Sequence, residues 1–390
     1  MINVFLLALL FCGQIYLYRA LEPRLVAMAG HRRIRAVHYA LLAFQFVVLA
    51  ALSLDNNWPV YRPWGDAGPV GRTLSLAAGI WITGCSGAAV LLGARYLIGR
   101  VRSTRAAAAP GDASRRRFLA TAAHAAAVLT PFGAAAYGAL VVRSSFELRD
   151  IPFPVHKLPP DLDGLRIALL TDIHFGPYLG RAELDRVIDM ANETRPHLTL
   201  VTGDLITRRG DPLDACLAQL AGVRAEAGAW GCLGNHETYA RCENYTQREA
   251  RRLGIEFLRQ GSRLLRFGGA ELNLVGVDYQ SLQRPYLVGA GSFVRPGAVN
   301  LLMSHNPDVF PVAADLGYDL VVGGHTHGGQ VTVEILEQTL NVCRFYTPFV
   351  AGLYRLGSSA LYVSRGIGTI NLPVRLGARP EVTLLRLTAA

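Results

Sequence analysis

Residues 323–330 read Gly-Gly-His-Thr-His-Gly-Gly-Gln, which places His325 and His327 one residue apart between two pairs of glycines. Glycine has no Cβ, so it allows positive φ and lets the backbone approach a bound group closely. On an extended chain, side chains at i and i+2 point the same way. The stretch therefore predicts two imidazoles that face one small site, as metal coordination requires.

Four other short apolar runs also end at a turn with polar side chains at its tip. Runs of four or five apolar residues bounded by turns are typical of strands buried on both faces. Helix-like segments separate them at 181–194, 211–221, 245–253 and 307–314, which indicates an α/β domain. Because ligands bind at the carboxyl ends of strands in open α/β sheets, we expect the tips to converge on one site. The tips are Asp172 with His174, Asp204, Asn235 with His236, His305, and His325 with His327.

The donor chemistry of these tips indicates a pair of metal ions. Together they supply three oxygen donors and four imidazoles, with His236 in addition, which exceeds the needs of one tetrahedral ion. Such a set suits two ions about 3.5–4 Å apart. Imidazole and carboxylate donors without a thiolate favour Mn, Fe or Zn over Mg or Ca. The expected cofactors are therefore two divalent transition-metal ions.

Five sequence blocks occur in this region in the order TDIH, TGD, GNHE, SHNP and GGHTHGG. They resemble those of the calcineurin-like metallophosphoesterase superfamily. The tail, GLYRLGSSALYVSRGIGT followed by LPVRLGARPEVTLL, is similar to that of its bacterial membrane-attached subgroup. The resemblance covers residues 164–390. It implies an α/β fold with two packed β-sheets flanked by helices, a four-layer sandwich.

The resemblance also implies how the ligands divide and what the site does. Asp204 is expected to bridge both ions, and a metal-bridging hydroxide attacks phosphorus. His236 is expected to donate a proton to the leaving oxygen or to stabilise the phosphate. The implied activity is metal-dependent hydrolysis of a phosphoester or pyrophosphate bond. The implied ligands are Asp172, His174, Asp204 and His327 for one ion, and Asp204, Asn235, His305 and His325 for the other.

A catalytically silent metal-binding sensor or scaffold is the alternative function. Retention of His236 beside all seven expected ligands favours the enzyme, since a silent relative has no need of that acid. One departure concerns the second block, which many relatives continue as G-D-x-x-D, whereas here it reads Gly-Asp-Leu-Ile-Thr-Arg. Arg208 at the end of this stretch either contacts a substrate phosphate or is a solvated surface side chain.

The first 142 residues differ in composition from the rest of the chain. They hold 14 arginines against 4 acidic residues, whereas residues 143–390 are neutral, so the net charge of +10 belongs to this part. We do not interpret it as a nucleic-acid footprint. Each of four uncharged apolar runs is long enough to cross a bilayer. We expect an all-α membrane region with spans near 2–18, 36–54, 73–94 and 118–142, followed by a proline-rich linker at 143–163.

The arginines also predict an orientation. Segments 19–36 and 95–117 hold five and seven of them, which places both in the cytoplasm by the positive-inside rule. Ser114–Leu119 resembles a twin-arginine export signal, and an ordinary positive flank is the alternative. Both interpretations place the C-terminal domain on the periplasmic or extracellular side of a bacterial cytoplasmic membrane. The expected partners are the lipid bilayer and a phosphate-containing substrate, for which lipid linkage is favoured and monoester, diester and pyrophosphate all stay open.

Overall fold

The computed structural model describes residues 68–103, 113–281, 284–335 and 338–390, together with five isolated residues before them. These residues belong to two compact units, which we describe separately. The helical unit comprises Met1–Val141 and Asn371–Val374, and the sheet unit comprises Val142–Ile370 and Arg375–Ala390. The apolar runs expected to span at 2–18 and 36–54 lie outside the described residues.

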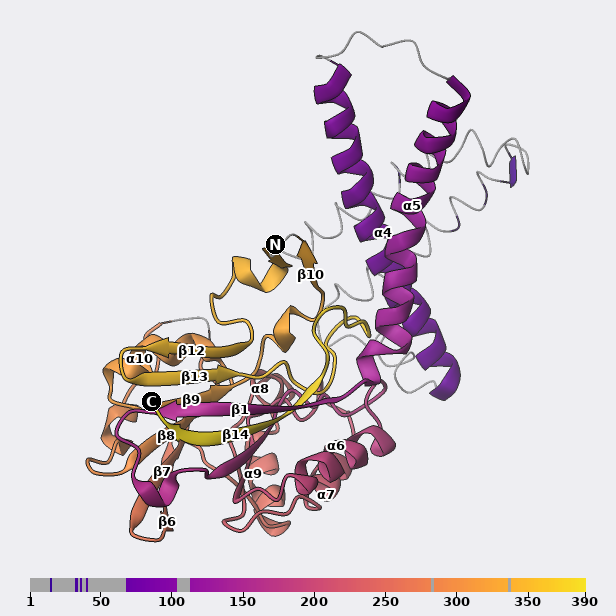
Figure 1. Cartoon of the computed structure of the whole chain (residues 1–390). Coiled ribbons are helices and arrows are strands. Elements are labelled where there is room, and N and C mark those ends of the chain that lie inside the picture. The colour runs from indigo at the N-terminus through magenta and orange to yellow at the C-terminus, as the bar shows by residue number, and fades with distance from the viewer. Residues whose placement is uncertain are drawn as a thin grey trace. The chain divides into compact units, whose positions relative to one another are not determined.

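Two long helices make up the described part of the helical unit (Figure 1). They are α4, Gly68–Ser103, and α5, Ala113–Leu140. Within and just beyond them, Leu76–Gly99 and Phe118–Ser144 are long and apolar enough to cross a membrane. The third and fourth expected spans therefore coincide with helices. Of the four spans expected from the sequence, only these two are supported by the described residues.

Small residues allow α4 and α5 to approach each other closely. A Cβ at Gly84 would lie 2.5 Å from Phe132 Cδ1, and a Cβ at Gly87 would lie 2.8 Å from Pro131 Cβ. Trp81 packs edge-on against the Phe132 ring at a centroid distance of 5.5 Å. Glycine at such positions is a common basis for the association of apolar helices, because it brings two backbones into van der Waals contact.

The sheet unit contains two six-stranded mixed sheets. In the first, strands two to five of the chain run parallel, and the last strand of the chain lies between the first two. The first sheet consists, in spatial order, of β1 (Glu147–Val155), β14 (Glu381–Ala389), β2 (Arg166–Leu170), β3 (Leu198–Val201), β4 (Ala229–Gly231) and β5 (Ile255–Phe257).

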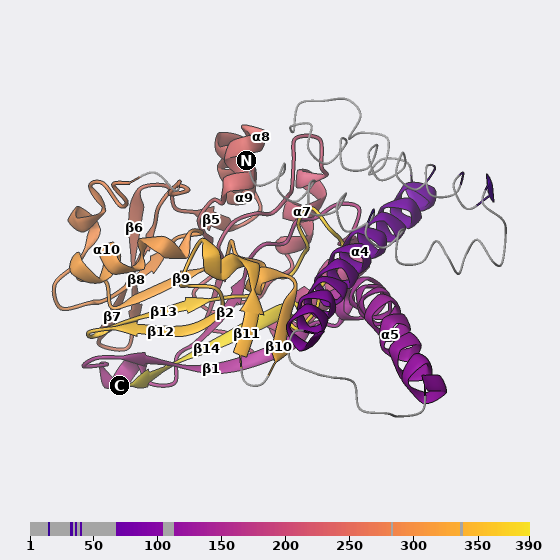
Figure 2. The same ribbon diagram turned by 90° about the horizontal axis from the view of Figure 1, so that it is seen from above.

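The second sheet has four parallel strands in the middle and an antiparallel strand at each edge. In spatial order it consists of β12 (Gly352–Leu356), β13 (Ser359–Val363), β9 (Leu320–Gly323), β8 (Val299–Met303), β7 (Ala270–Gly276) and β6 (Gly261–Phe267). A separate two-stranded ribbon is formed by β10 (Thr332–Ile335) and β11 (Gln338–Asn341), which Figure 2 shows side by side.

Helices cover the outer faces of both sheets. The outer face of the first sheet packs against α6 (Arg181–Glu193), α7 (Leu213–Leu220), α8 (Asn235–Ala240) and α9 (Glu243–Arg252). The outer face of the second packs against α10 (Phe310–Asp315), and a third apolar layer fills the space between the sheets. The order helices, sheet, sheet, helix confirms the predicted pair of packed sheets flanked by helices.

The sheet unit also contains short 3₁₀ turns, which are η2 (Val142–Ser144), η3 (Pro160–Leu162), η4 (Ala290–Phe293), η5 (Pro307–Val309), η6 (His327–Gly329) and η7 (Val342–Phe345).

The structure differs from the linker expected over 143–163. Residues Glu147–Val155 of that stretch form β1, which pairs in parallel with β14 and places Pro152 opposite Arg386. Proline lacks a backbone N–H, so it is tolerated in a strand at the edge of a sheet, where the N–H has no partner to lose. Because β1 is such an edge strand, its prolines do not prevent it from pairing with β14. These prolines are the reason that the sequence predicted a linker here.

Candidate metal centre

The predicted site residues follow the carboxyl ends of parallel strands in both sheets. Asp172 comes after β2, Asp204 after β3 and Asn235 after β4, while His305 follows β8 and His325 follows β9. The polar tips therefore belong to five different strands, three in the first sheet and two in the second. The two sheets face each other across a shared core, so these ends meet at one edge of the unit.

Side-chain donors form three overlapping groups, in each of which the candidate ligand atoms lie within 4.8 Å of one another. Two residues, His174 and Asp204, belong to two groups each, so the groups form one continuous cluster. Every member except His325 is buried. The groups are Asp172, His174 and His327; His174, Asp204 and His236; and Asp204, His305 and His325.

Asp204 is at the centre of the cluster. Its Oδ2 lies 3.0 Å from His305 Nε2, 3.6 Å from His174 Nε2 and 3.9 Å from His236 Nε2. Its other oxygen, Oδ1, accepts a hydrogen bond of 3.0 Å from the backbone N–H of His236. A carboxylate with imidazoles on several sides is well placed to be shared between two cations.

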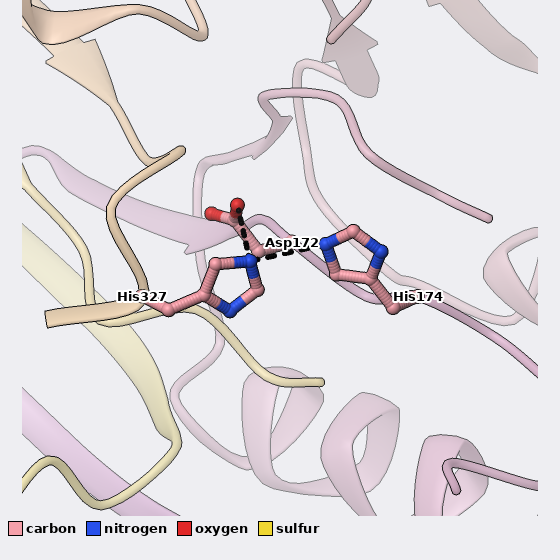
Figure 3. A group of neighbouring side chains, drawn as sticks. All are labelled: Asp172, His174 and His327. Carbon is pink, nitrogen blue, oxygen red and sulfur yellow. Dashed lines mark hydrogen bonds and ion pairs between the residues drawn. The ribbon is translucent and has the colours of Figure 1, made fainter. Parts of the chain in front are cut away.

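Asp172 is the second carboxylate of the cluster, and its Oδ1 lies 3.9 Å from Nε2 of His305, which is closer to Asp204. Its Oδ1 lies 3.3 Å from His327 Nε2, and His174 Nε2 lies 3.1 Å from the same nitrogen, so that three donors converge (Figure 3). The backbone N–H of His325 donates to both carboxylate oxygens of Asp172 at 3.0 Å. This contact links the loop after β2 to the loop after β9.

The backbone at the site is unusual. Asp172, His174, Asp204, His325 and His327 all have positive φ, between 48° and 71°. Such values are uncommon for residues with a Cβ and concentrate at functional sites, where the surrounding structure enforces them. The i, i+2 pairs therefore do not lie on extended chain, and that physical reason for their convergence is wrong. In each pair the two outer residues have left-handed φ and are separated by one residue that does not.

Two glycines allow the backbone to approach the Asp172 side chain closely. A Cβ on Gly324 would lie 2.0 Å from Asp172 Oδ2, and one on Gly366 would lie 2.6 Å from Asp172 Cβ. The glycine before the His-Thr-His turn is thus required by the close approach of the Asp172 carboxylate.

The donor set fits divalent cations. Within the described part of the chain, the buried Asn235 Oδ1 has no hydrogen-bond partner, although Asn235 is only 5% exposed. A buried carbonyl oxygen without a donor is costly unless a bound group satisfies it. A cation next to Asp204 is such a group, and the surrounding imidazoles and carboxylates are the donors that Mn, Fe and Zn accept.

Burial keeps most of the imidazoles in the form that binds metal. Burial lowers the pKa of His174 to about 3 and that of His325 to about 4, so both are neutral at physiological pH. His305 differs, because burial lowers its pKa but the adjacent Asp204 outweighs that effect and raises it to about 10. Burial raises the pKa of the Asp172 carboxyl to about 6.

A buried carboxylate supports the Asp204 side. Glu237 is fully buried and accepts hydrogen bonds from the backbone N–H groups of Gly234 (2.8 Å), Asp204 (2.9 Å) and Leu205 (2.8 Å). It therefore fixes the turn that carries Asp204 and the turn that carries Asn235. Sequence reasoning missed this role, although the glutamate stands within the quoted block GNHE.

A buried guanidinium supports the Asp172 side. Arg375 is fully buried and donates to the carbonyl oxygens of Arg365 (2.8 Å), Ala378 (3.1 Å), Gly366 (3.2 Å) and Gly368 (3.0 Å). Its Nη2 lies 3.3 Å from Nδ1 of His327, the nitrogen that faces away from the cluster. Burial lowers the pKa of Arg375 to about 10, so the group stays charged at neutral pH. An arginine inside the apolar stretch LPVRLG was the only available sequence signal.

Thr207 orients two imidazoles. Its Oγ1 lies 3.0 Å from His174 Nδ1, and its carbonyl oxygen accepts from His236 Nδ1. Thr207 and Arg208 both donate their backbone N–H to Asp211 Oδ2 at 3.0 Å, and Arg208 Nε lies 3.6 Å from Asp211 Oδ1. The Arg208 side chain thus has an acidic neighbour in its own turn, and its contact with a substrate phosphate stays a prediction.

Two tyrosines stand beside the histidines. The Tyr279 ring lies 5.8 Å from the His325 ring and 6.3 Å from the His305 ring, measured between centroids. Tyr239 lies 5.6 Å from the His236 ring and is 55% exposed. Tyr239 lies three residues after His236 in α8, so helical spacing was a signal that sequence reasoning missed. No local spacing linked Tyr279 to the site, because it lies in the loop after β7.

Comparison with known proteins places this geometry in a family. Residues 165–329 match the calcineurin-like phosphoesterase family model. The chain is 31% identical over 303 residues to the "Transmembrane protein with metallophosphoesterase domain" of Bos taurus, covering 73% of this chain and 67% of that protein. It is 29% identical over 408 residues to the protein of the same name from Danio rerio, covering 99% of this chain and 89% of that one.

A bacterial relative extends the comparison. The chain is 28% identical over 279 residues to "Phosphodiesterase YaeI" of Escherichia coli, covering 70% of this chain and 99% of that protein. Because vertebrate proteins also match, the expected bacterial subgroup is too narrow a description. Together with the five converging strand ends, these matches establish that the chain belongs to the calcineurin-like phosphoesterase family.

Proposed function

We propose that the sheet unit hydrolyses phosphoester or pyrophosphate bonds with two divalent transition-metal ions. The observation that carries this proposal is the position of Asp204, whose Oδ2 has imidazole nitrogens from three separate segments of the chain within 3.9 Å. One ion would be held on the side of Asp172, His174 and His327, and the other on the side of Asn235, His305 and His325, with Asp204 between them. When bound, the ions supply a water of lowered pKa and positive charge opposite the phosphoryl oxygens.

His236 is the proposed acid of the reaction. It stands in the first turn of α8, and its ring lies edge-on to that of His174 at a centroid distance of 4.8 Å. Because Nδ1 donates to the carbonyl of Thr207, the ring is fixed with Nε2 on the side of Asp204. That nitrogen is then available to donate a proton or a hydrogen bond to the leaving oxygen of a substrate.

The test uses the full chain purified in detergent and loaded with Mn. We expect hydrolysis of p-nitrophenyl phosphate or bis(p-nitrophenyl) phosphate, and His236→Ala is expected to lower kcat about 10²- to 10⁴-fold with metal content retained. His156→Ala is the matched control, because this histidine is exposed and lies after β1, away from the cluster. Metal binding without turnover of either ester would instead support a sensor or scaffold.

We also propose that the chain is anchored in a membrane through Leu76–Gly99 and Phe118–Ser144. The arginine-rich segment 95–117, which runs from the end of the first span to the start of the second, would lie in the cytoplasm, and the sheet unit on the opposite side. Such an anchor favours a lipid-linked phosphate as substrate. Resistance of the chain to alkaline extraction from membranes, with digestion of the sheet unit by protease added from the non-cytoplasmic side, is the expected result. Release into the soluble fraction would contradict the anchor.

A further inference from the structure

One short segment of the sheet unit exposes large apolar side chains to solvent. We call Val342, Phe345 and Tyr346, which belong to η7 and the residue after it, the aromatic hook. Their exposed fractions are 64%, 87% and 56%, and Phe345 is the most exposed large apolar residue in the described part of the chain. Single exposed apolar residues are normal, but a group of them indicates contact with a partner or a membrane.

The exposed apolar residues of the sheet unit are concentrated in this part of the chain. Ten large ones are exposed among its described side chains, and six of these fall within 333–356. The six are Val333, Val342, Phe345, Tyr346, Leu353 and Leu356. The concentration of these residues argues that the exposure is a property of this segment rather than a random feature of the surface.

Hydrogen bonds fix the backbone that carries the aromatic hook. Asn341 accepts from the backbone N–H of Cys343 and donates to the carbonyl of Gly328, both at 2.8 Å. The Cys343 thiol lies 3.7 Å from the carbonyl oxygen of Thr326. Thr326 and Gly328 flank the metal-site residue His327, so the hook is built directly on the loop that carries the ligands. A partner that covers the hook is therefore brought close to the metal centre.

The charged residues near the aromatic hook indicate what kind of surface it contacts. Within 333–356, Glu334 and Glu337 balance Arg344 and Arg355 in charge. Both acidic residues precede the hook, and the stretch from Gln338 to Ser358 that holds it has no acidic residue and two exposed arginines. Aromatic rings beside arginine are typical of protein surfaces at the interface between lipid and water. Anionic headgroups attract basic side chains near the membrane surface.

Chain connectivity gives the hook access to a bilayer. The apolar segment Phe118–Ser144 ends three residues before β1 begins at Glu147. If that segment crosses a membrane, the sheet unit is tethered next to the lipid surface, and a few exposed aromatic side chains suffice to hold it there. A weak contact becomes effective under such a tether, because the local concentration of lipid is high.

We propose that the aromatic hook inserts into the interfacial layer of a bilayer, with Arg344 among anionic headgroups, and holds the metal centre at the level of lipid phosphates. The proposal rests on the proposed membrane anchor, but not on catalysis. It concerns the positioning of the site, and it makes a phosphate carried by a membrane lipid the substrate that the site meets first.

The experiment places a reporter at the tip of the hook in the full chain. Phe345→Trp is reconstituted into vesicles of phosphatidylcholine and phosphatidylglycerol, with and without bromine on the upper acyl carbons, and its fluorescence is compared with that of the unmodified chain. We expect the added tryptophan to lose most of its emission to the brominated lipid and to resist quenching by aqueous acrylamide. Arg344→Gln in the same background is expected to reduce the lipid quenching most in vesicles rich in phosphatidylglycerol.

Val288→Trp is the matched control, because Val288 is 69% exposed in a different loop of the same unit. It is expected to be quenched by acrylamide and spared by brominated lipid. Equal behaviour of the two tryptophans would overturn the proposal. So would a Phe345→Trp signal that is protected from both quenchers in a concentration-dependent way, which would assign the hook to a second copy of the chain. Alkaline extraction of the same samples tests the anchor separately, and phosphoesterase activity plays no part in the readout.

Discussion

The two sides of the metal centre are supported by buried groups of opposite charge. On the Asp172 side, the guanidinium of Arg375 stands behind His327 and binds four backbone carbonyls. On the Asp204 side, the carboxylate of Glu237 binds three backbone N–H groups. Both supports are fully buried, yet one places a positive charge near a cation site and the other a negative charge.

This difference predicts that the two proposed ion positions are not equivalent. A buried cation close to His327 opposes a metal ion there, whereas a buried anion beneath Asp204 favours one, and in a low-dielectric interior such effects are only weakly screened. We therefore expect the Asp204 side to bind its ion more tightly and the Asp172 side to exchange its ion more readily. Four variants or conditions test that asymmetry.

The largest effect is expected from Asp204→Asn, because this residue serves both sides. Metal content is expected to fall towards zero and phosphoesterase activity by more than about 100-fold, since even indirect support of a ligand is worth 10–100-fold. Asp172→Asn is expected to retain one ion per chain. Elemental analysis of the purified variants distinguishes them, and equal metal loss in both would show that the two positions bind only as a unit.

Glu237→Gln is expected to weaken metal binding about 10- to 100-fold through displacement of the Asp204 turn. The variant is also expected to lose about 1–3 kcal/mol of unfolding free energy, because an amide cannot accept the three hydrogen bonds as the carboxylate does. Metal titration and chemical denaturation of the metal-free protein measure the two effects. Glu226→Gln, at an exposed position, serves as control and is expected to change neither.

A pH titration separates the two sides through their protons. His174, with a pKa lowered to about 3 by burial, is already neutral, whereas His305, with a pKa raised to about 10, keeps its proton in the metal-free site. Metal binding on the Asp204 side must therefore displace that proton, and affinity is expected to rise about tenfold per pH unit between about 6.5 and 8. Calorimetry in buffers of different ionisation enthalpy would detect one released proton, and a pH-independent affinity would refute the assignment.

The same shift has a consequence for folding with the opposite sign. In the metal-free protein, the raised pKa of His305 stabilises the fold below its ordinary value of 6.5, and that contribution is lost as the pH rises towards about 10. Metal addition and alkaline pH thus compete for one imidazole.

The smallest effect is expected from Arg375→Gln. Removal of the buried charge is expected to tighten metal binding on the Asp172 side by about fivefold, or ~1 kcal/mol, even though the loss of carbonyl contacts lowers stability. Arg375→Lys keeps the charge with fewer donors, so it is expected to lower stability without the gain in affinity. Weaker metal binding in both variants would mean that Arg375 acts only by holding the loop.

The sequence predicted which residues supply the donors of the site, but it did not predict the backbone conformation of these residues. Strand ends such as Asp204 and His305 could be recognised, because apolar runs and turn residues are local signals. The positive φ of Asp172 and His327 could not be predicted, since this conformation at residues with a Cβ is imposed by neighbours distant in the chain. The roles of Glu237 and Arg375 were not predicted for a similar reason. Each acts through hydrogen bonds to backbone groups that are distant in the sequence or hidden in turns, and the sequence does not show these contacts.

The place of β14 has a consequence for how the protein is made. This strand comes last among the strands of the chain, yet it pairs with both β1 and β2. Until residues 381–389 have been synthesised, β1 has no partner strand, and β2, which leads to Asp172, has one unpaired edge. β14 is added at this edge only after the strands that lead to the other proposed ligands have been synthesised, so we expect the Asp172 flank of the site to be completed last.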